Sequence, residues 1–243
     1  MDEFVIGDIL KKSRKLLKTG EINIKIKLPS EPEYRIGDMF LYPFWRKQGY
    51  GGENHETGED MTGEEYHLKY FPDSIASEYM MKSKKSKNFD VLFDIINSRK
   101  KYHILPPKNT LVMHLRVGDV IDDRGWNDKS VKDLLTYGSL YVKSLYSIYK
   151  ILNCAIRNGI ESVHIVYGFH KEGKFLKSKL YLACVYLYCK ENGFDVKLIT
   201  QSDADKALVY LTYSDLFAPS GGGFSYIISR LVKKNGKKVC RVR

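Results

Sequence analysis

Cysteine, tryptophan and long apolar runs are all scarce in this sequence of 243 residues, which has four cysteines and two tryptophans. The cysteines show no metal-ligand spacing, so we interpret them as buried free thiols, which suit a reducing compartment. They stand at Cys154, Cys184, Cys189 and Cys240. No stretch approaches the roughly 20 apolar residues that a membrane helix needs, so we expect no membrane span.

Acidic residues are also in the minority, with 29 Asp and Glu against 40 Lys and Arg and a formal net charge of +11. This excess of positive charge favours an anionic partner, or is simply a property of a soluble surface. The lysines are scattered and are not gathered with aromatic residues into a known nucleic-acid-binding motif. Charge is therefore the only support for nucleic-acid binding, and a basic protein that handles phosphates fits it equally well.

The first part of the chain predicts one helix, one strand and a long loop. The N-terminus, MDEFVIGDILKKSRK, places acids before a short apolar patch and bases after it, the wrong order for a secretory signal. We expect an amphipathic helix there and a cytoplasmic location. Ile22–Leu28 alternates strictly between apolar and polar residues and predicts a half-buried strand. Residues 46–65 are polar and glycine-rich and predict a functional or mobile loop.

Two adjacent prolines, Pro106 and Pro107, separate the halves of the chain. Before them, Asn88 is a good N-cap for a helix that continues through FDVLFDIINSRK. We place a domain boundary at the prolines. The prediction is a smaller N-terminal α/β region over residues 1–107 and a second domain over 108–243.

Strand and helix patterns alternate regularly through the second half. Strands are predicted at 111–116, 162–167, 196–200, 215–220 and 237–242, and helices at 136–157, 174–191, 204–212 and 224–234. Glycine follows each of the longer helices, at Gly159, Gly193 and Gly236, which is the usual C-terminal signal. This alternation predicts an α/β fold, a Rossmann-like parallel sheet flanked by helices on both faces.

The first of these strands, in TLVMHLRVGD, ends in polar residues. His114, Arg116 and Asp119 follow one another closely, with Gly118 marking a turn. In an open parallel sheet, ligands bind beyond the carboxyl ends of the strands, and an arginine there can donate two hydrogen bonds to a phosphate. The alternative is an Arg–Asp pair that fixes the turn, with a core histidine beside it. The residues alone leave both interpretations open.

A second stretch, SDLFAPSGGGFSYIISRLV, has glycine and serine between a strand and a helix. The residues concerned are Ser220, Gly221, Gly222, Gly223 and Ser225. Glycines let main-chain N–H groups approach an anion, and a helix N-terminus adds partial positive charge. A flexible linker or a purely structural turn are the alternatives. With the first stretch, this one predicts a site for a diphosphate.

Both stretches resemble motifs of the fucosyltransferase superfamily, which includes the α1,2-, α1,6- and protein O-fucosyltransferases. HLRVGD resembles the motif H-x-R-x-(G)-D of that superfamily. GGGFSYIISRL resembles its later motif, in which a strand ending in Ser is followed by S/G-x-F-S and a helix. The separation of about 100 residues is also similar, and the resemblance covers residues 110–243. It implies a reduced GT-B-like arrangement.

The resemblance also implies roles for single residues. Arg116 matches the arginine that grips the β-phosphate of the sugar nucleotide, and His114 matches the histidine near the donor. Gly223, Phe224 and Ser225 match the segment that wraps the diphosphate and the base. An acidic residue about one helix earlier contacts the guanine, and Asp205, or else Asp203, is the nearest candidate.

Two departures concern the linkage and the hydroxyl contacts. Val117 stands where the α1,2 and α1,6 families usually have a second arginine, which the protein O-fucosyltransferases also lack. Glycines precede Phe224 where serines or threonines are usual. The first departure weakens the assignment of a linkage, and the second puts the hydroxyl contacts in doubt.

Asp203-Ala204-Asp205 also fits D-x-D, a metal-holding pair of another glycosyltransferase architecture. Helix capping and base recognition are the other interpretations, and we expect no metal and no cofactor besides the GDP-sugar co-substrate. Arg116 and main-chain amides would then neutralise the leaving diphosphate.

Further polar residues are weaker candidates. His170 follows the second predicted strand and either contacts a ligand or is an exposed loop histidine. Arg35, Gly37 and Asp38 are candidates for lining the facing domain. The loop residues Asn54, His55, Glu56, Glu59 and Asp60 have no convincing metal or nucleophile spacing.

The leading hypothesis is therefore a metal-independent glycosyltransferase that moves a sugar, fucose first of all, from a GDP-sugar to a hydroxyl of a carbohydrate or glycan acceptor. The N-terminal region would lie on the acceptor side. Asp119 is the first candidate for the general base, although it is equally a structural partner for Arg116. The alternative is a non-catalytic module that binds a nucleotide or phosphate.

Overall fold

The computed structural model describes residues 3–27, 36–41, 49–50, 61–123, 128–169 and 173–240. Most of the predicted loop 46–65 lies outside these residues, and so do Arg35 and His170.

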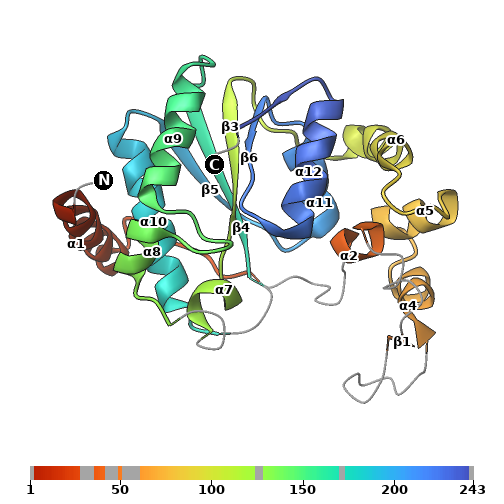
Figure 1. Cartoon of the computed structure of the whole chain (residues 1–243), viewed down its shortest axis with the longest axis horizontal. Helices are drawn as coiled ribbons and strands as arrows, with labels where there is room; N and C mark the ends of the chain where they lie inside the picture. The colour runs from red at the N-terminus through yellow and green to blue at the C-terminus, as the bar shows by residue number, and fades with distance from the viewer. Residues whose placement is uncertain are drawn as a thin grey trace.

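The centre of the fold is a sheet of five parallel strands in the order β5-β4-β3-β6-β7. The strands are β3 (Thr110–Arg116), β4 (Ser162–Gly168), β5 (Asp195–Thr200), β6 (Leu216–Ala218) and β7 (Lys238–Val239). Each lies within or overlaps the segment predicted for it, and helices cover both faces (Figure 1). The predicted α/β fold with a Rossmann-like parallel sheet is confirmed.

Alternate residues of β3 face different layers. Leu111, Met113 and Leu115 belong to a buried cluster to which five helices contribute, including the short helix α7 (Asp119–Asp122). The other four are α1 (Glu3–Thr19), α8 (Val131–Tyr137), α9 (Leu145–Ile156) and α10 (Leu176–Glu191), which lie together on one side of the sheet in Figure 1. Helix α1 is the predicted N-terminal amphipathic helix.

Val112 faces the opposite layer and packs in a second buried cluster. The helices that contribute to this cluster are α2 (Ile36–Leu41), α5 (Ile75–Lys82), α6 (Phe89–Arg99), α11 (Ala204–Thr212) and α12 (Gly222–Lys234).

The described N-terminal residues also form α4 (Gly63–Tyr70), the 3-10 turn η1 (Lys100–Tyr102) and an antiparallel pair, β1 (Gly49–Tyr50) with β2 (Met61–Thr62). Asn88 caps α6 as predicted, because its side chain accepts from the N–H of Val91.

Two predicted elements are wrong. The helix expected over 136–157 is divided between two helices. The first ends before Gly138, whose φ of +70° does not continue a helix. A side chain would not fit there, since a Cβ would lie 2.8 Å from the carbonyl oxygen of Val142. The half-buried strand expected at Ile22–Leu28 does not form over its described part, residues 22–27. Ile22 and Ile24 are buried as the alternation requires, but they pack in the cluster that contains α1.

Contacts cross the predicted boundary at residue 107. Helix α1 packs on α10, and α2 packs on α12. The division into 1–107 and 108–243 stays a prediction. Within the described part of the chain, the helices are all too short or too polar to cross a membrane.

Candidate functional site

The chain reverses its direction of travel across the sheet between β3 and β6. After β3 it continues to β4 and β5 on one side, and β6 and β7 lie on the other. Connections therefore leave the carboxyl ends of β3 and β6 toward opposite sides, and crevices at such a point bind ligands in open α/β sheets. His114 and Arg116 end β3, and the glycine-rich turn that begins at Ser220 follows β6. The structure thus brings the two predicted stretches together.

Arg116 is held from three directions. Its main-chain N–H donates to Oγ of Ser220 at 3.1 Å, and its Nη2 donates to Oδ2 of Asp119 at 3.2 Å. Its guanidinium lies over the ring of Tyr141, with Cζ 4.7 Å from the ring centroid. Its Nε is buried and has no hydrogen-bond partner among the described residues. An orphan donor of this kind in a native fold calls for a ligand, ion or water.

His114 connects the same strand to α12. Its Nδ1 lies 2.7 Å from Oγ of Ser225, and its ring meets that of Phe224 edge to face. Oγ of Ser225 also accepts from the N–H of Ser220 at 3.3 Å. Ser225 therefore joins β3, the turn and the helix, which accounts for the pairing of the two motifs in space.

The glycines of the turn are placed where side chains do not fit. Gly222 has a φ of +76°, which favours glycine, and a Cβ on Gly223 would lie 2.9 Å from Cδ1 of Leu41. A Cβ on Gly37 would meet the main-chain nitrogen of Phe224 at 3.5 Å. Helix α2 therefore packs directly against the start of α12. Gly37, one of the weaker candidates, lies beside the site, and nothing is described of the side chain of Asp38.

Asp119 begins α7 (Asp119–Asp122), the short helix that follows the end of β3. Gly118 has a φ of +80°, and its N–H donates to Oγ of Ser178 at 2.8 Å. Oδ1 of Asp119 is buried and lacks a hydrogen-bond partner among the described residues. The carboxylate is thus an ion-pair partner of Arg116 with one oxygen still unsatisfied, so both sequence interpretations of Asp119 remain open.

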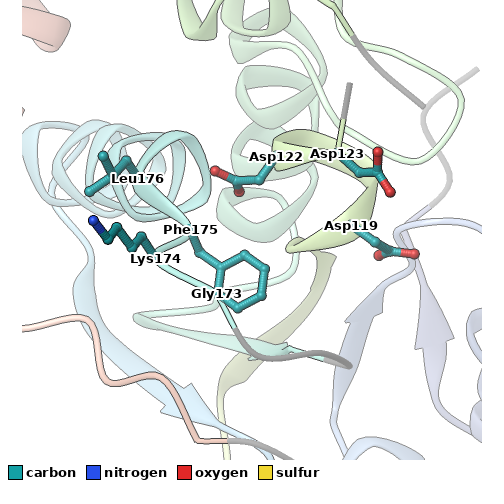
Figure 2. Close-up of a pocket in the computed structure, with 7 residues that line it drawn as sticks. All are labelled: Asp119, Asp122, Asp123, Gly173, Lys174, Phe175 and Leu176. Carbon is teal, nitrogen blue, oxygen red and sulfur yellow. The ribbon is translucent and has the colours of Figure 1, made fainter. Parts of the chain in front are cut away.

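A pocket of about 400 Å³ adjoins Asp119. Its lining comes from α7 and from the segment that begins α10, and consists of Asp119, Asp122, Asp123, Gly173, Lys174, Phe175 and Leu176. Figure 2 shows Asp122 directed toward α10, where its carboxylate accepts from the N–H groups of Lys177 and Ser178. The carboxylate of Asp122 is therefore occupied by the main-chain N–H groups at the N-terminus of α10.

The two aspartates of the D-x-D pattern have separate structural roles. Asp203 caps α11, because its side chain accepts from the N–H of Lys206 at 2.9 Å. Burial acts to raise the pKa of Asp203, but hydrogen bonds from Lys206 prevail and hold it below its ordinary value. Asp205 accepts from the N–H of Ile75 at 2.8 Å and lies 3.7 Å from Nη1 of Arg99.

The described residues include no group of three or more His, Cys, Asp or Glu side chains that could hold a metal ion. The expectation that no metal is needed stays a prediction. Asp205 lies at the N-terminus of α11, which follows β5, and its assigned contact with guanine stays a prediction. His170 and the polar residues of the 51–60 loop lie outside the described residues.

Tyr141 is the residue that the sequence reasoning missed. It stands in the segment between α8 and α9, where a continuous helix was expected, and no residue pattern links it to Arg116. The sequence Gly138-Ser139 is a turn signal that could have divided the helix. Nothing local could have placed the ring of Tyr141 under the guanidinium.

Comparisons with known proteins give similarity in structure alone. No protein-family model matches the chain, and no curated protein sequence matches it. Among solved structures, POFUT1 in complex with GDP-fucose aligns at 16% identity over 65% of this chain and 51% of that chain, with a TM-score of 0.36. POFUT1 in complex with GDP aligns at 13% identity over 89% of this chain and 79% of that chain, with a TM-score of 0.39. The chain spans about half the length of the first of these structures.

Proposed function

We propose that this protein is a glycosyltransferase that moves a sugar, fucose first of all, from a GDP-sugar to a hydroxyl group of a carbohydrate or glycan acceptor. One observation carries the proposal. The guanidinium of Arg116 stands beside a glycine-rich turn at the reversal point of the sheet, with its buried Nε lacking a partner in the described chain. The resemblance of HLRVGD and GGGFSYIISRL to fucosyltransferase motifs adds the donor class.

The residues support a metal-independent way to release the diphosphate. Arg116 would hold the β-phosphate, and main-chain N–H groups at the start of α12 would contact the same anion. Charge that develops on the departing diphosphate would meet donors that are already in position. His114, fixed through Ser225, would line the donor side together with Phe224.

The acceptor hydroxyl must lose a proton when it attacks the anomeric carbon. Asp119 is our candidate general base because it adjoins Arg116 and lines the pocket of Figure 2. The acceptor would enter from the side of the site that the N-terminal region forms, where α2 packs against the glycine-rich turn.

Thermal-shift measurements with nucleotides test the donor class. We expect GDP and GDP-fucose to raise the melting temperature, because a ligand that binds only the folded state stabilises it. UDP and CMP serve as controls, and the shift with GDP should survive EDTA. A shift with UDP or CMP but with no guanine nucleotide would contradict the donor, and loss of the shift in EDTA would contradict metal independence.

Turnover separates an enzyme from a binding module. We expect release of GDP from GDP-fucose, measured as free GDP, to be faster with the protein than without it and to rise when glycan acceptors are added. Saturable binding of GDP with no release of GDP under any acceptor would favour the non-catalytic nucleotide-binding module instead.

A further inference from the structure

Tyr141 lies between the two parts of the candidate site. Its ring faces the guanidinium of Arg116 with a distance of 4.7 Å from Cζ to the ring centroid. Its carbonyl oxygen accepts from Oγ of Ser220 at 2.7 Å, and that same hydroxyl oxygen accepts from the N–H of Arg116. The residue therefore contacts Arg116 through its ring and is linked to it a second time through Ser220.

The glycine-rich turn also packs against the ring of Tyr141. A Cβ on Gly221 would lie 2.9 Å from Cδ1 of Tyr141, and one on Gly222 would lie 3.6 Å from Cε1 of Tyr141 and 3.7 Å from Nη1 of Arg116. These distances leave no room for a side chain at Gly221. The absence of side chains at both positions lets the ring and the guanidinium pack against the turn.

The segment that carries Tyr141 is fixed at both ends. The N–H of Ser139 donates to the carbonyl oxygen of Val142 at 2.8 Å, and Gly138 supplies the positive φ that this tight turn requires. The hydroxyl of Tyr181, a fully buried residue, donates to the carbonyl oxygen of Lys143 at 2.7 Å. The ring of Tyr141 is thus presented by a rigid turn.

We propose that Tyr141 is a positioning residue that orients the guanidinium of Arg116 for the diphosphate of the donor. The aromatic face attracts the cation and restricts it to one plane. Asp119 holds Nη2 from another direction, so an arginine that would otherwise sample many rotamers is ordered before the ligand arrives. This inference rests on the proposed function and adds a residue that lies outside both motifs.

A comparison of GDP with GMP tests the role, because only GDP has the β-phosphate. Calorimetry would measure both affinities in the wild type, in Tyr141→Phe and in Tyr141→Leu. We expect Tyr141→Phe to keep the GDP affinity, since the ring is retained. Tyr141→Leu should lose about fivefold in GDP affinity with little change for GMP. Equal losses for both nucleotides, or no loss, would overturn the proposal.

Two further sets of variants separate a positioning role of Tyr141 from a role in folding. In Arg116→Met, which leaves no cation for the ring to orient, Tyr141→Leu should cause no further loss for GDP. If Tyr141→Leu does not fold, fluorinated phenylalanines at position 141 keep the shape of the ring and weaken its negative face. GDP affinity should then fall stepwise with fluorine content, and a flat series would overturn the proposal.

Binding of GDP to the wild-type protein distinguishes failure of the proposed function from failure of the positioning role. If the wild type binds neither GDP nor GDP-fucose, the proposed function fails and this inference fails with it. If it binds GDP and Tyr141→Leu binds as tightly, only the positioning role fails.

Discussion

The Nδ1 atom of His114 lies 2.7 Å from Oγ of Ser225, so the end of β3 is joined directly to the first turn of α12. Ser225 is 1% exposed, and its hydroxyl oxygen also accepts from the N–H of Ser220. One buried hydroxyl therefore connects the strand that carries Arg116, the glycine-rich turn and the helix. The geometry of the candidate site depends on it.

Ser225→Ala should lower the free energy of unfolding by about 1–2 kcal/mol, because it leaves polar groups of His114 and Ser220 without this partner. Urea denaturation measures the change. Ser229→Ala is the matched control: Ser229 is also buried in α12, but its hydroxyl donates to the carbonyl oxygen of Ser225 within the helix. We expect Ser229→Ala to lower the free energy of unfolding by less than Ser225→Ala does. Equal decreases would argue against a special role for Ser225.

Arg116→Lys should abolish most of the function without unfolding the protein. An ammonium group cannot reproduce the planar, two-pronged contact of a guanidinium with a phosphate. The expected loss is about 2–4 kcal/mol in transition-state stabilisation, measured as kcat/KM for GDP release. Circular dichroism and the melting temperature would show that the fold survives.

Arg230→Lys is the control for that variant. Arg230 lies on α12 but stacks over Phe89, with Cζ 5.3 Å from the ring centroid. We expect its nucleotide affinity and turnover to match the wild type. Should Arg116→Lys unfold while any folded fraction keeps its nucleotide affinity, Arg116 is structural and the functional interpretation of HLRVGD is wrong.

The strands and most helices follow from local pattern. Thr110 to Met113 form a buried apolar run, which is typical of a strand covered on both faces, and the glycines after α9, α10 and α12 all have positive φ. Such signals act within a few residues of one another. Sequence therefore predicts the elements and, through the strand ends, the edge of the sheet where the site lies.

What the sequence could not predict depends on contacts between distant segments. Ile22 and Ile24 alternate as a strand would, yet no neighbouring strand pairs with them in the described structure, and they pack with α1 instead. Asp205 accepts from the N–H of Ile75, a residue 130 positions away. The stacking of Tyr141 on Arg116 is likewise set by the meeting of two loops, which no periodicity records.

His164 should make the stability of the protein depend on pH. Burial, and then the nearby charge of Lys197, lower the pKa of His164 from its ordinary value of 6.5. The folded state thus binds this proton less readily than the unfolded chain. The stabilising contribution is complete above about pH 6.5, and it is lost as the pH falls through the lower folded-state pKa.

His164→Gln removes this titration and retains a side chain that can bond to the hydroxyl of Tyr210, the partner of Nδ1. Urea denaturation at about pH 7.5 and about pH 5.5 would compare the two proteins. The wild type should lose more stability over that interval than the variant, because the carboxylates that also titrate are common to both. Equal losses would show that His164 is not perturbed in the fold.

Asp205→Asn tests whether the acid at the start of α11 recognises the base. A carboxylate can accept two hydrogen bonds from the edge of guanine, whereas an amide offers one acceptor and places a donor against a donor. The ratio of GDP to ADP affinity, measured by calorimetry, should therefore fall by at least about tenfold. The free energy of unfolding should fall by less than the corresponding loss in binding free energy, because the amide oxygen can still accept from the N–H of Ile75.

Asp203→Asn provides the matched control two residues earlier. Asparagine is as good an N-cap as aspartate, so α11 should remain intact and the preference for guanine should not change. If Asp205→Asn lowers the melting temperature and leaves the GDP to ADP ratio unchanged, Asp205 serves to join α11 to α5 and Arg99. The base would then have to be read by other groups at the carboxyl edge of the sheet, and the donor-binding assignment of Asp205 would be wrong.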